Sequence, residues 1–274
     1  MSSKVILFDV GNTGMKIGIA STDSGAPIAA SYMLPTDPVA TVDSLGLLLD
    51  ASLRHAGANN VSACVASSVV PSMDPVLDEA CAKYLGCSVR FVPDDLPFPM
   101  ENRYERPAEV GADRLLAAYA AVELHPAQAH IVIDFGTATT FDCVLGRAYL
   151  GGLICPGVLS STRSLAGQTA KLPQIRLQIL EEADPTPSIG RSTSQSLTHG
   201  LLFGFASMLD GVVERLSAIL NEEARGAMTE PPLVVATGGV ARAVCRVART
   251  PIVLDQDLLL AGLKKLHDQA PDFT

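Results

Sequence analysis

The sequence contains no tryptophan, and only 5% of its residues are aromatic and 18% charged, whereas 48% are hydrophobic. This composition excludes a disordered chain and indicates a folded protein with a sizeable core. Basic residues are also few: 20 Lys and Arg stand against 29 Asp and Glu, which gives a formal net charge of −9. Because nucleic-acid binding needs clustered cations, and no basic run occurs, we expect no nucleic-acid partner.

Long hydrophobic runs are missing as well. The apolar stretches at residues 45–49 and 201–206 are too short to cross a bilayer. The first nine residues lack the apolar region and the cleavage site of a signal peptide. We therefore expect a cytoplasmic protein without a membrane partner. The six cysteines form no Cys-x-x-Cys pair and show no zinc-binding spacing, which favours buried, reduced thiols.

The two commonest phosphate-binding motifs are absent too. The chain has no Gly-x-x-x-x-Gly-Lys-Ser/Thr and no Gly-x-Gly-x-x-Gly after its first predicted strand. Instead it carries one pattern twice, at residues 4–20 and 131–145: an apolar strand that ends in Asp-x-Gly and Asn or Thr, then a second strand. A carboxylate, a glycine and a hydroxyl at one sharp turn can hold a metal-bound polyphosphate. An ordinary hairpin turn, rich in Asn, Gly and Asp, explains one copy but not both.

Hydrophobic periodicity predicts the order β-β-β-α-β-α-β-α in both halves of the chain. The expected strands are 4–9, 15–20, 28–34, 61–66, 88–92, 130–134, 139–145, 148–154, 234–237 and 251–254, and the expected long helices are 38–56, 74–85, 113–124, 158–168, 192–224 and 257–268. Strands that alternate with helices indicate an α/β fold with mixed sheets. We expect two domains, 1–124 and 125–274.

The first of the two turns is the better-equipped phosphate site. Asp9 follows a strand, at the sheet edge where ligands of α/β proteins bind, and its carboxylate suits Mg²⁺. Gly11 and Gly14 leave space for a ligand beside the backbone, and Thr13 adds a hydroxyl. Lys16 could place a positive charge near the phosphates.

Two later segments add chemistry. Thr237-Gly238-Gly239 ends an apolar strand and would let a flat base approach the backbone. Asp113 stands at the start of an apolar helix, where it is either a helix N-cap or a base that accepts a proton from a substrate hydroxyl. Arg114 could bind a substrate carboxylate through its planar guanidinium or simply be solvated.

The duplicated Asp-x-Gly hairpin resembles the actin-like, sugar-kinase and heat-shock ATPase superfamily, in which two ribonuclease-H-like domains enclose ATP in the cleft between them. Within it, the chain resembles the type III pantothenate kinase family. The similar segments are Asp9-Val-Gly-Asn-Thr, Val110-Gly-Ala-Asp-Arg, Ile133-Asp-Phe-Gly-Thr-Ala-Thr-Thr, Gly151-Gly-Leu-Ile-Cys-Pro-Gly and Ala236-Thr-Gly-Gly, and further on Ala170-Lys-Leu-Pro, Ile189-Gly-Arg-Ser-Thr and Asp255-Gln-Asp-Leu-Leu-Leu-Ala-Gly-Leu.

The resemblance implies transfer of the γ-phosphate of ATP to the 4′-hydroxyl of pantothenate, the first step of coenzyme A biosynthesis. It also implies a homodimer that needs Mg²⁺ with ATP and a monovalent cation, K⁺ or NH₄⁺. Asp113 would be the catalytic base, Asp9 would lie near Mg²⁺ and Asp134 would bind K⁺. The implied ATP-binding residues are Asp9, Val10, Gly11, Asn12, Thr13, Gly14, Met15, Lys16, Thr137, Gly238 and Gly239. The implied pantothenate-binding residues are Tyr104, Gly111, Ala112, Asp113, Arg114 and Thr193.

The chain departs from the family in three places. Arg106-Pro107 replaces the common Asn-Pro of the substrate loop, and Gly190-Arg191-Ser192-Thr193 replaces Gly-Lys-Asn-Thr. Lys16 is not uniform in the family, so its assignment depends on charge and position alone.

Three alternatives stay open. An ATP-dependent activator of a 2-hydroxyacyl-CoA dehydratase, which carries a four-iron–four-sulfur cluster, begins with a pattern similar to residues 9–16, but its cysteine-bearing glycine-rich segment is missing here. A non-catalytic regulator on the same fold is disfavoured by the intact Asp9, Asp113 and Asp134. Another small-substrate kinase of the superfamily is the third, although the cysteine zinc motif of one large sugar-kinase group is absent.

Overall fold

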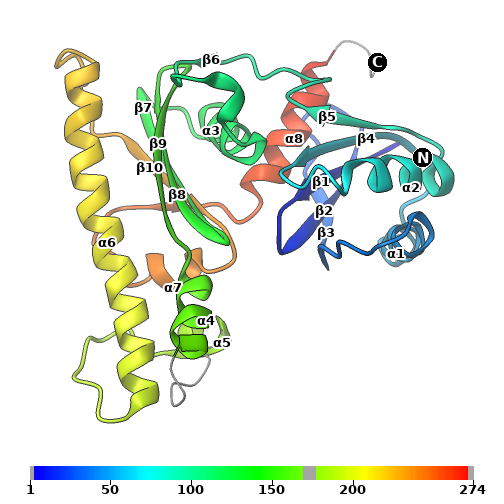
Figure 1. The fold of residues 1–274 in the computed structure, drawn as a ribbon. Helices are drawn as coiled ribbons and strands as arrows, with labels where there is room; N and C mark the ends of the chain where they lie inside the picture. The colour runs from blue at the N-terminus through cyan, green and yellow to red at the C-terminus, as the bar shows by residue number, and fades with distance from the viewer. Residues whose placement is uncertain (1–2, 169–176, 271–274) are drawn as a thin grey trace. The chain divides into compact units, whose positions relative to one another are not determined.

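The computed structural model describes residues 3–168 and 177–270 (Figure 1). Its contacts divide the chain into two compact units. Unit 1 comprises Met1–Met100, Arg106–His125 and Asp257–Thr274, and unit 2 comprises Glu101–Glu105 and Pro126–Gln256. The domain boundary expected at residue 124 stays a prediction; the contacts assign the end of the chain to unit 1.

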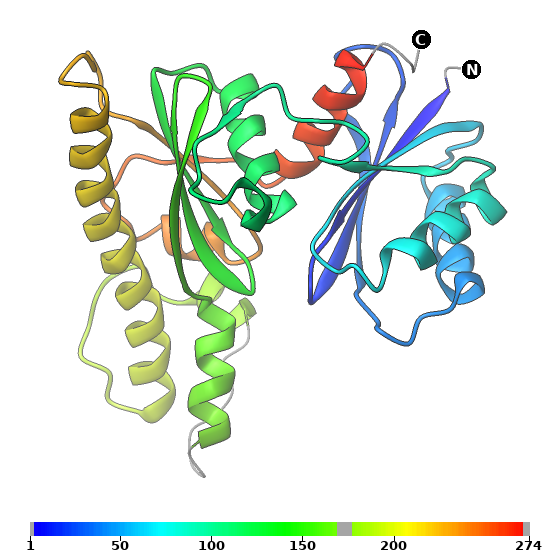
Figure 2. The same cartoon turned by 45° about the horizontal axis from the view of Figure 1, so that its top comes forward.

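Unit 1 is built on a five-stranded mixed sheet in the order β3-β2-β1-β4-β5. β1 pairs antiparallel with β2 and parallel with β4. The elements of this unit are β1 (Lys4–Val10), β2 (Gly14–Ser21), β3 (Ile28–Pro35), α1 (Val42–His55), β4 (Val61–Ser68), α2 (Asp74–Leu85), β5 (Val89–Val92), the short 3₁₀ helix Pro107–Glu109, α3 (Ala112–Leu124) and α8 (Leu258–Gln269). In Figure 2, α1 and α2 lie on one face of this sheet and the red helix α8 lies on the other.

The side chains of β1 alternate between the two faces of the sheet, so successive residues pack against different helices. Ile6 and Phe8 belong to a buried cluster with apolar residues of α1 and α2. Neighbouring strand residues point to opposite faces, so Leu7 and its β2 partner Gly18 face α8. Gly18 is needed there, because a Cβ would lie 3.0 Å from the Leu260 side chain. Asp9 therefore ends β1 on the α8 face.

Unit 2 repeats this order with an added edge strand: β11-β10-β7-β8-β9-β6. Its elements are β6 (Glu101–Asn102), β7 (Ala129–Phe135), β8 (Ala138–Leu145), β9 (Ala148–Pro156), α4 (Val158–Gln168), α5 (Leu177–Glu182), α6 (Thr193–Glu223), β10 (Leu233–Thr237), α7 (Ala241–Cys245) and β11 (Val253–Leu254). The predicted α/β class with a duplicated mixed sheet is confirmed. β6, α5 and the 3₁₀ helix were not predicted, since each is too short to show a period.

Helix α6 corrects one expectation. It has 31 residues and is the one helix of the described residues that is long and apolar enough, by length and composition, to cross a membrane. A core helix passes the same test, and Leu202, Leu209 and Leu220 of α6 are buried in the core of unit 2. One such helix is weak evidence for a membrane span.

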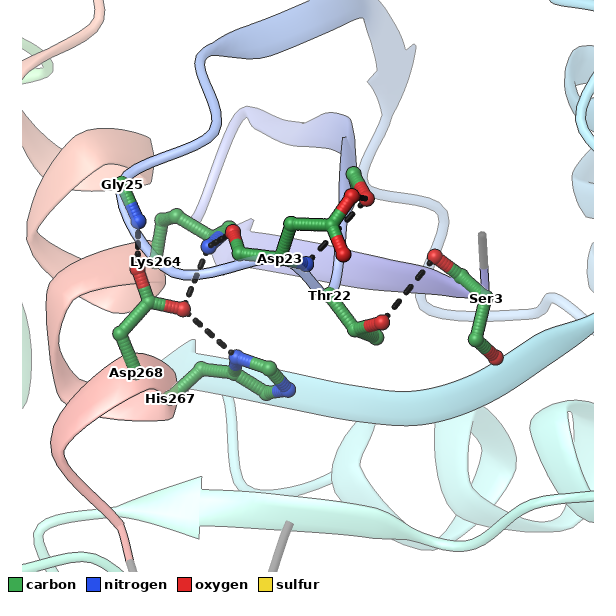
Figure 3. Close-up of polar contacts among 8 residues, drawn as sticks. Ser3, Thr22, Asp23, Gly25, Lys264, His267 and Asp268 are labelled. Carbon is green, nitrogen blue, oxygen red and sulfur yellow. Dashed lines mark hydrogen bonds and ion pairs between the residues drawn. The ribbon is translucent and has the colours of Figure 1, made fainter. Parts of the chain in front are cut away.

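A buried ion pair holds the far end of α8 to the turn between β2 and β3 (Figure 3). Lys264 is only 4% exposed, donates to the Asp23 carbonyl at 3.0 Å and pairs with Asp268. The Asp268 carboxylate also accepts from the Gly25 N–H at 2.9 Å and lies 3.1 Å from His267 Nδ1. Burial opposes ionisation of Asp268, but these hydrogen bonds outweigh it and lower the pKa.

We expect Asp268→Asn to destabilise the protein by about 3–5 kcal/mol at neutral pH, because it leaves the Lys264 ammonium buried without its countercharge. The folded pKa of Asp268 is below its usual 3.8. The stabilisation is therefore complete above pH 3.8 and lost as the pH falls through the folded value, and the difference between variant and wild type should shrink there. Denaturant unfolding at several pH values measures both effects.

Asp43→Asn is the matched control, because Asp43 pairs with Lys83 at 2.6 Å on an exposed surface. Asp43→Asn also removes a negative charge from a Lys–Asp ion pair, and it should lower the free energy of unfolding far less than Asp268→Asn. Equal losses for the two variants would contradict the anchoring role of the buried pair.

Candidate active site

Two hydrogen bonds stabilise the turn after β1, and one of them comes from Thr36, the residue after β3. Gly11 N–H donates to the Gly14 carbonyl at 3.0 Å, and the Thr36 hydroxyl donates to the Gly11 carbonyl at 2.6 Å. Asn12 and Thr13 are exposed at the tip of this turn. Val10 and Met15 are each 1% exposed and join the core, so they hold the turn rather than line its open side.

Asp9 lies between two polar residues of the adjacent strands. The sheet register puts Lys16 of β2 opposite Asp9 on one side and Ser67 of β4 opposite on the other. Burial first, and then the charge of Asp113, raise the pKa of Asp9 from 3.8 to about 7, while Lys16 acts in the opposite direction. A carboxylate so short of countercharge, next to open turn amides, fits a divalent cation that also binds phosphate oxygens.

Helix α3 brings the second carboxylate to this site. Gly111 is the residue before the helix, and the Asp113 carboxylate packs over it and accepts from the Arg114 N–H at 2.8 Å. Asp113 is thus in the first turn of α3, and its reading as the N-cap was wrong. Burial raises the pKa of Asp113 in spite of the lowering effects of the Arg114 N–H and guanidinium. Arg114 is only 8% exposed, so it is not a solvated surface residue.

Lys16 has a partner that the sequence did not suggest. Its ammonium lies 2.9 Å from the carboxylate of Asp257, the residue before α8. Asp257 and Thr36 are the residues of this site that sequence reasoning missed. Asp257 lies 241 positions after Lys16, and the local sequence there indicates only an ordinary helix start. Thr36 follows the edge strand β3, and the local sequence there indicates only an ordinary turn.

The second Asp-x-Gly turn and the Gly-Gly segment meet inside unit 2. Asp134 of β7 is opposite Thr237 of β10 in the parallel register. Gly238 follows with φ +96°, and a Cβ there would lie 2.5 Å from Asp134 Oδ1 and 2.7 Å from the Phe135 backbone. Two predicted ATP-site segments far apart in the sequence are therefore in direct contact, and only glycine fits where they touch.

Three further predicted residues lie elsewhere in unit 2. Thr137 is exposed in the turn after β7, and its carbonyl accepts from the Ser160 hydroxyl at 2.7 Å. Tyr104 packs on Tyr149 with ring centroids 6.3 Å apart. Thr193 is the exposed first residue of α6. The predicted segment Ala170-Lys-Leu-Pro lies outside the described residues.

Comparisons with solved structures agree with the duplicated sheet. A putative Baf family transcriptional activator from Campylobacter jejuni is similar with a TM-score of 0.59 and 16% identity, over 97% of this chain and 99% of that chain. Component A of the (R)-2-hydroxyglutaryl-CoA dehydratase of Acidaminococcus fermentans is similar with a TM-score of 0.52 and 13% identity, over 98% of each chain. At such identities the likeness shows the fold alone.

The two mixed sheets in matching order are those of the actin-like and sugar-kinase ATPase fold class. The sequence comparisons show that this chain is an ATP-dependent kinase. A sequence model of type III pantothenate kinase matches residues 5–215. Type III pantothenate kinases of Nitratidesulfovibrio vulgaris and Oleidesulfovibrio alaskensis are 53% and 54% identical, each over 97% of this chain and over 98% and 97% of their own lengths. The chain belongs to the type III pantothenate kinase family.

We expect Gly238→Ala to destabilise unit 2 by about 1–3 kcal/mol and to weaken ATP binding, because its Cβ would displace the Asp134 carboxylate and the Phe135 backbone and strain the positive φ. Gly204→Ala is the control, since Gly204 is in α6 of the same unit, belongs to no predicted ligand-binding segment, would place its Cβ within 4 Å of nothing and has no positive φ. Unfolding and calorimetric nucleotide titration compare the two. Equal effects of the two substitutions would show that the close approach at Gly238 is not needed.

Proposed function

We propose a division of labour for the reaction of this enzyme, the phosphorylation of pantothenate in coenzyme A biosynthesis. Residues of unit 1 bind the phosphates of ATP and activate the acceptor hydroxyl. Residues of unit 2 bind the adenosine and a monovalent cation. The observation that supports this best is the pair of carboxylates, Asp9 and Asp113, which come from different elements of unit 1 and lie near enough for the charge of Asp113 to raise the pKa of Asp9.

The phosphates would lie on the turn at residues 11–14. Its tip carries the exposed amide and hydroxyl groups of Asn12 and Thr13, and Gly11 leaves space beside the backbone. Asp9 would hold Mg²⁺, which supplies positive charge to the phosphate oxygens during transfer. Lys16 would add charge from the neighbouring strand, oriented by Asp257.

Asp113 would accept the proton of the pantothenate 4′-hydroxyl as that oxygen attacks the γ-phosphorus. Its burial raises the pKa, which makes the carboxylate a stronger base than an exposed one. The Asp113 side chain is held over Gly111 by the Arg114 N–H, so its direction is set before substrate binds. Arg114, a buried cation, would pair with the pantothenate carboxylate, and Gly111 and Ala112 would line the same region.

In unit 2, Asp134 would bind K⁺ or NH₄⁺, Thr137 would contact ATP, and Gly238 and Gly239 would lie against the adenosine. The contact between Asp134 and Gly238 supports a common ligand site there. Tyr104 and Thr193 would complete the pantothenate site. We also propose a cytoplasmic homodimer, supported by the exposed apolar side chains Leu153, Ile154 and Ile219 beside a cavity of about 440 Å³ in unit 2.

The iron–sulfur activator and the non-catalytic regulator have weaker support. Their likeness to this chain is one of fold, at 13% and 16% identity in the two comparisons above. The full-length kinase relatives are more than three times as similar. No observation in the structure favours either alternative.

We expect Asp113→Asn to lower kcat by a factor of about 10²–10⁴, because an amide cannot accept the hydroxyl proton. Affinity for Mg²⁺ with a non-hydrolysable ATP analogue should remain, since Asp113 has no role in holding the phosphates. A coupled ADP-release assay with pantothenate and a calorimetric titration measure the two quantities. Asp50→Asn, which makes the same change on the solvent side of α1, should leave both unchanged. Turnover of Asp113→Asn at the wild-type rate would refute the base assignment.

We expect the wild-type enzyme to turn over faster in K⁺ or NH₄⁺ than in Na⁺ at equal ionic strength, because the resemblance to the family implies a site for these ions at Asp134. Asp134→Asn should remove this preference and weaken ATP binding through Gly238. The same ADP-release assay, run in buffers with each cation, measures the preference. Equal rates in Na⁺ and K⁺ would contradict the proposed cation site but leave the base assignment intact.

A further inference from the structure

The hydroxyl of Ser67 is a buried polar group whose role the reaction described above does not include. Ser67 is 1% exposed at the end of β4, and its Oγ has no hydrogen-bond partner among the described residues. Buried hydroxyls in folded proteins are nearly always paired, because leaving one unpaired is costly. The adjacent Ser68 follows the rule, since its Oγ accepts from the Val70 N–H at 3.1 Å.

Ser67 points to the face of the sheet that carries Asp9. The two residues are partners in the parallel register of β1 and β4, about 4.8 Å apart across the sheet. Their predecessors, Phe8 and Ala66, are partners in the core on the opposite face. Side chains alternate along a strand, so Ser67 and Asp9 share the face that α3 and α8 contact.

Ser67 lies on the acceptor side of Asp9. Helix α3 contacts β4, and a Cβ on Gly111 would lie 2.6 Å from Asp113 Oδ1 and 3.7 Å from Val69, two residues beyond Ser67. On the other side of Asp9, Lys16 pairs with Asp257. Of the two strands that flank Asp9, the one that carries Ser67 is therefore also the one that α3, the helix of Asp113, contacts.

Unit 2 has a hydroxyl at the matching position. There Asp134, at the end of the first strand, is opposite Thr237, at the end of the parallel neighbour. Asp9 and Ser67 have the same relation in unit 1. The duplicated sheet thus places a carboxylate and a hydroxyl side by side twice, which is the arrangement of two ligand-binding ends rather than of a packing defect.

We propose that Ser67 is a nucleotide-binding residue whose Oγ–H donates to an oxygen of the Mg²⁺–ATP complex beside Asp9. That oxygen belongs either to the terminal phosphate or to a water held by the metal; both are strong acceptors and both suit a lone buried donor. The inference deepens the proposed function and depends on its assignment of the phosphates to unit 1. It explains why a hydroxyl is buried here with no hydrogen-bond partner among residues 3–168 and 177–270.

Ser67→Ala is the test, with binding and stability measured separately. Without nucleotide, the variant should unfold at the same or a higher denaturant concentration than wild type, because it removes an unpaired buried group. With Mg²⁺ and a non-hydrolysable ATP analogue, its affinity should fall about tenfold or more, as expected for a hydrogen bond to a charged acceptor. Calorimetric titration with the analogue and with ADP distinguishes the sources: a loss confined to the analogue identifies the terminal phosphate, and a loss with both identifies metal-bound water.

Two variants calibrate the measurement. Ser68→Ala removes a hydroxyl that has a structural partner and should lower the unfolding midpoint. Ser52→Ala removes one from the solvent side of α1, where it donates to the Leu48 carbonyl at 2.9 Å, and should leave nucleotide affinity unchanged.

Two outcomes would overturn the inference. Ser67→Ala could bind both nucleotides as tightly as wild type, or it could lose stability as Ser68→Ala does, which would show a structural partner. Neither depends on pantothenate being the acceptor. If the wild-type protein itself bound no nucleotide, the proposed function would fail instead.

Discussion

The buried carboxylate of Asp9 is the constraint around which unit 1 is arranged. Burial and the second carboxylate, Asp113, both oppose its ionisation, and Lys16 alone does not offset them. A site with this excess of negative charge is incomplete until a cation enters. This charge balance is why we propose that Mg²⁺, together with the phosphates of ATP, binds at the end of β1. The same charge balance also explains why open turn amides, and not further acidic residues, follow Asp9.

The duplication repeats one strand-end arrangement in both units. Both sheets have the same order, and in both an Asp ends the first strand next to a hydroxyl on the parallel neighbour. The two units differ in the residue of the second strand that pairs with this aspartate. Lys16 of β2 pairs with Asp9, whereas Thr140 of β8 pairs with Asp134. In the function we propose, a lysine there would suit the multiply charged phosphates, and a neutral threonine would leave the carboxylate of Asp134 to a monovalent cation.

Much of the fold, and part of the candidate site, could be predicted from the sequence. The apolar strands and the Asp-x-Gly turns are local patterns, and their repetition predicted the fold, which is confirmed. The roles of Asp9, Asp134 and Gly238 stay predictions. Ser67, Thr36 and Asp257 could not be predicted, because each is an ordinary residue locally and acquires its role from strand register or from a helix that arrives late in the chain. Periodicity reports which face a residue occupies, but not which residue of another element it meets.

The placement of α8 shows why unit 1 needs the end of the chain. Helices α1 and α2 cover one face of its sheet, and the other face, with Leu7 and Gly18, needs an apolar partner. α3 supplies part of it, and Gly262 lets α8 pack against Ala120 of α3 at a distance that no side chain would permit. Once α8 is there, its start meets Lys16 and its end is held by the buried pair of Lys264 and Asp268. The helix that completes the core therefore also brings in Asp257, the residue before it, as the partner of Lys16, so core packing and charge placement in unit 1 depend on the same late segment of the chain.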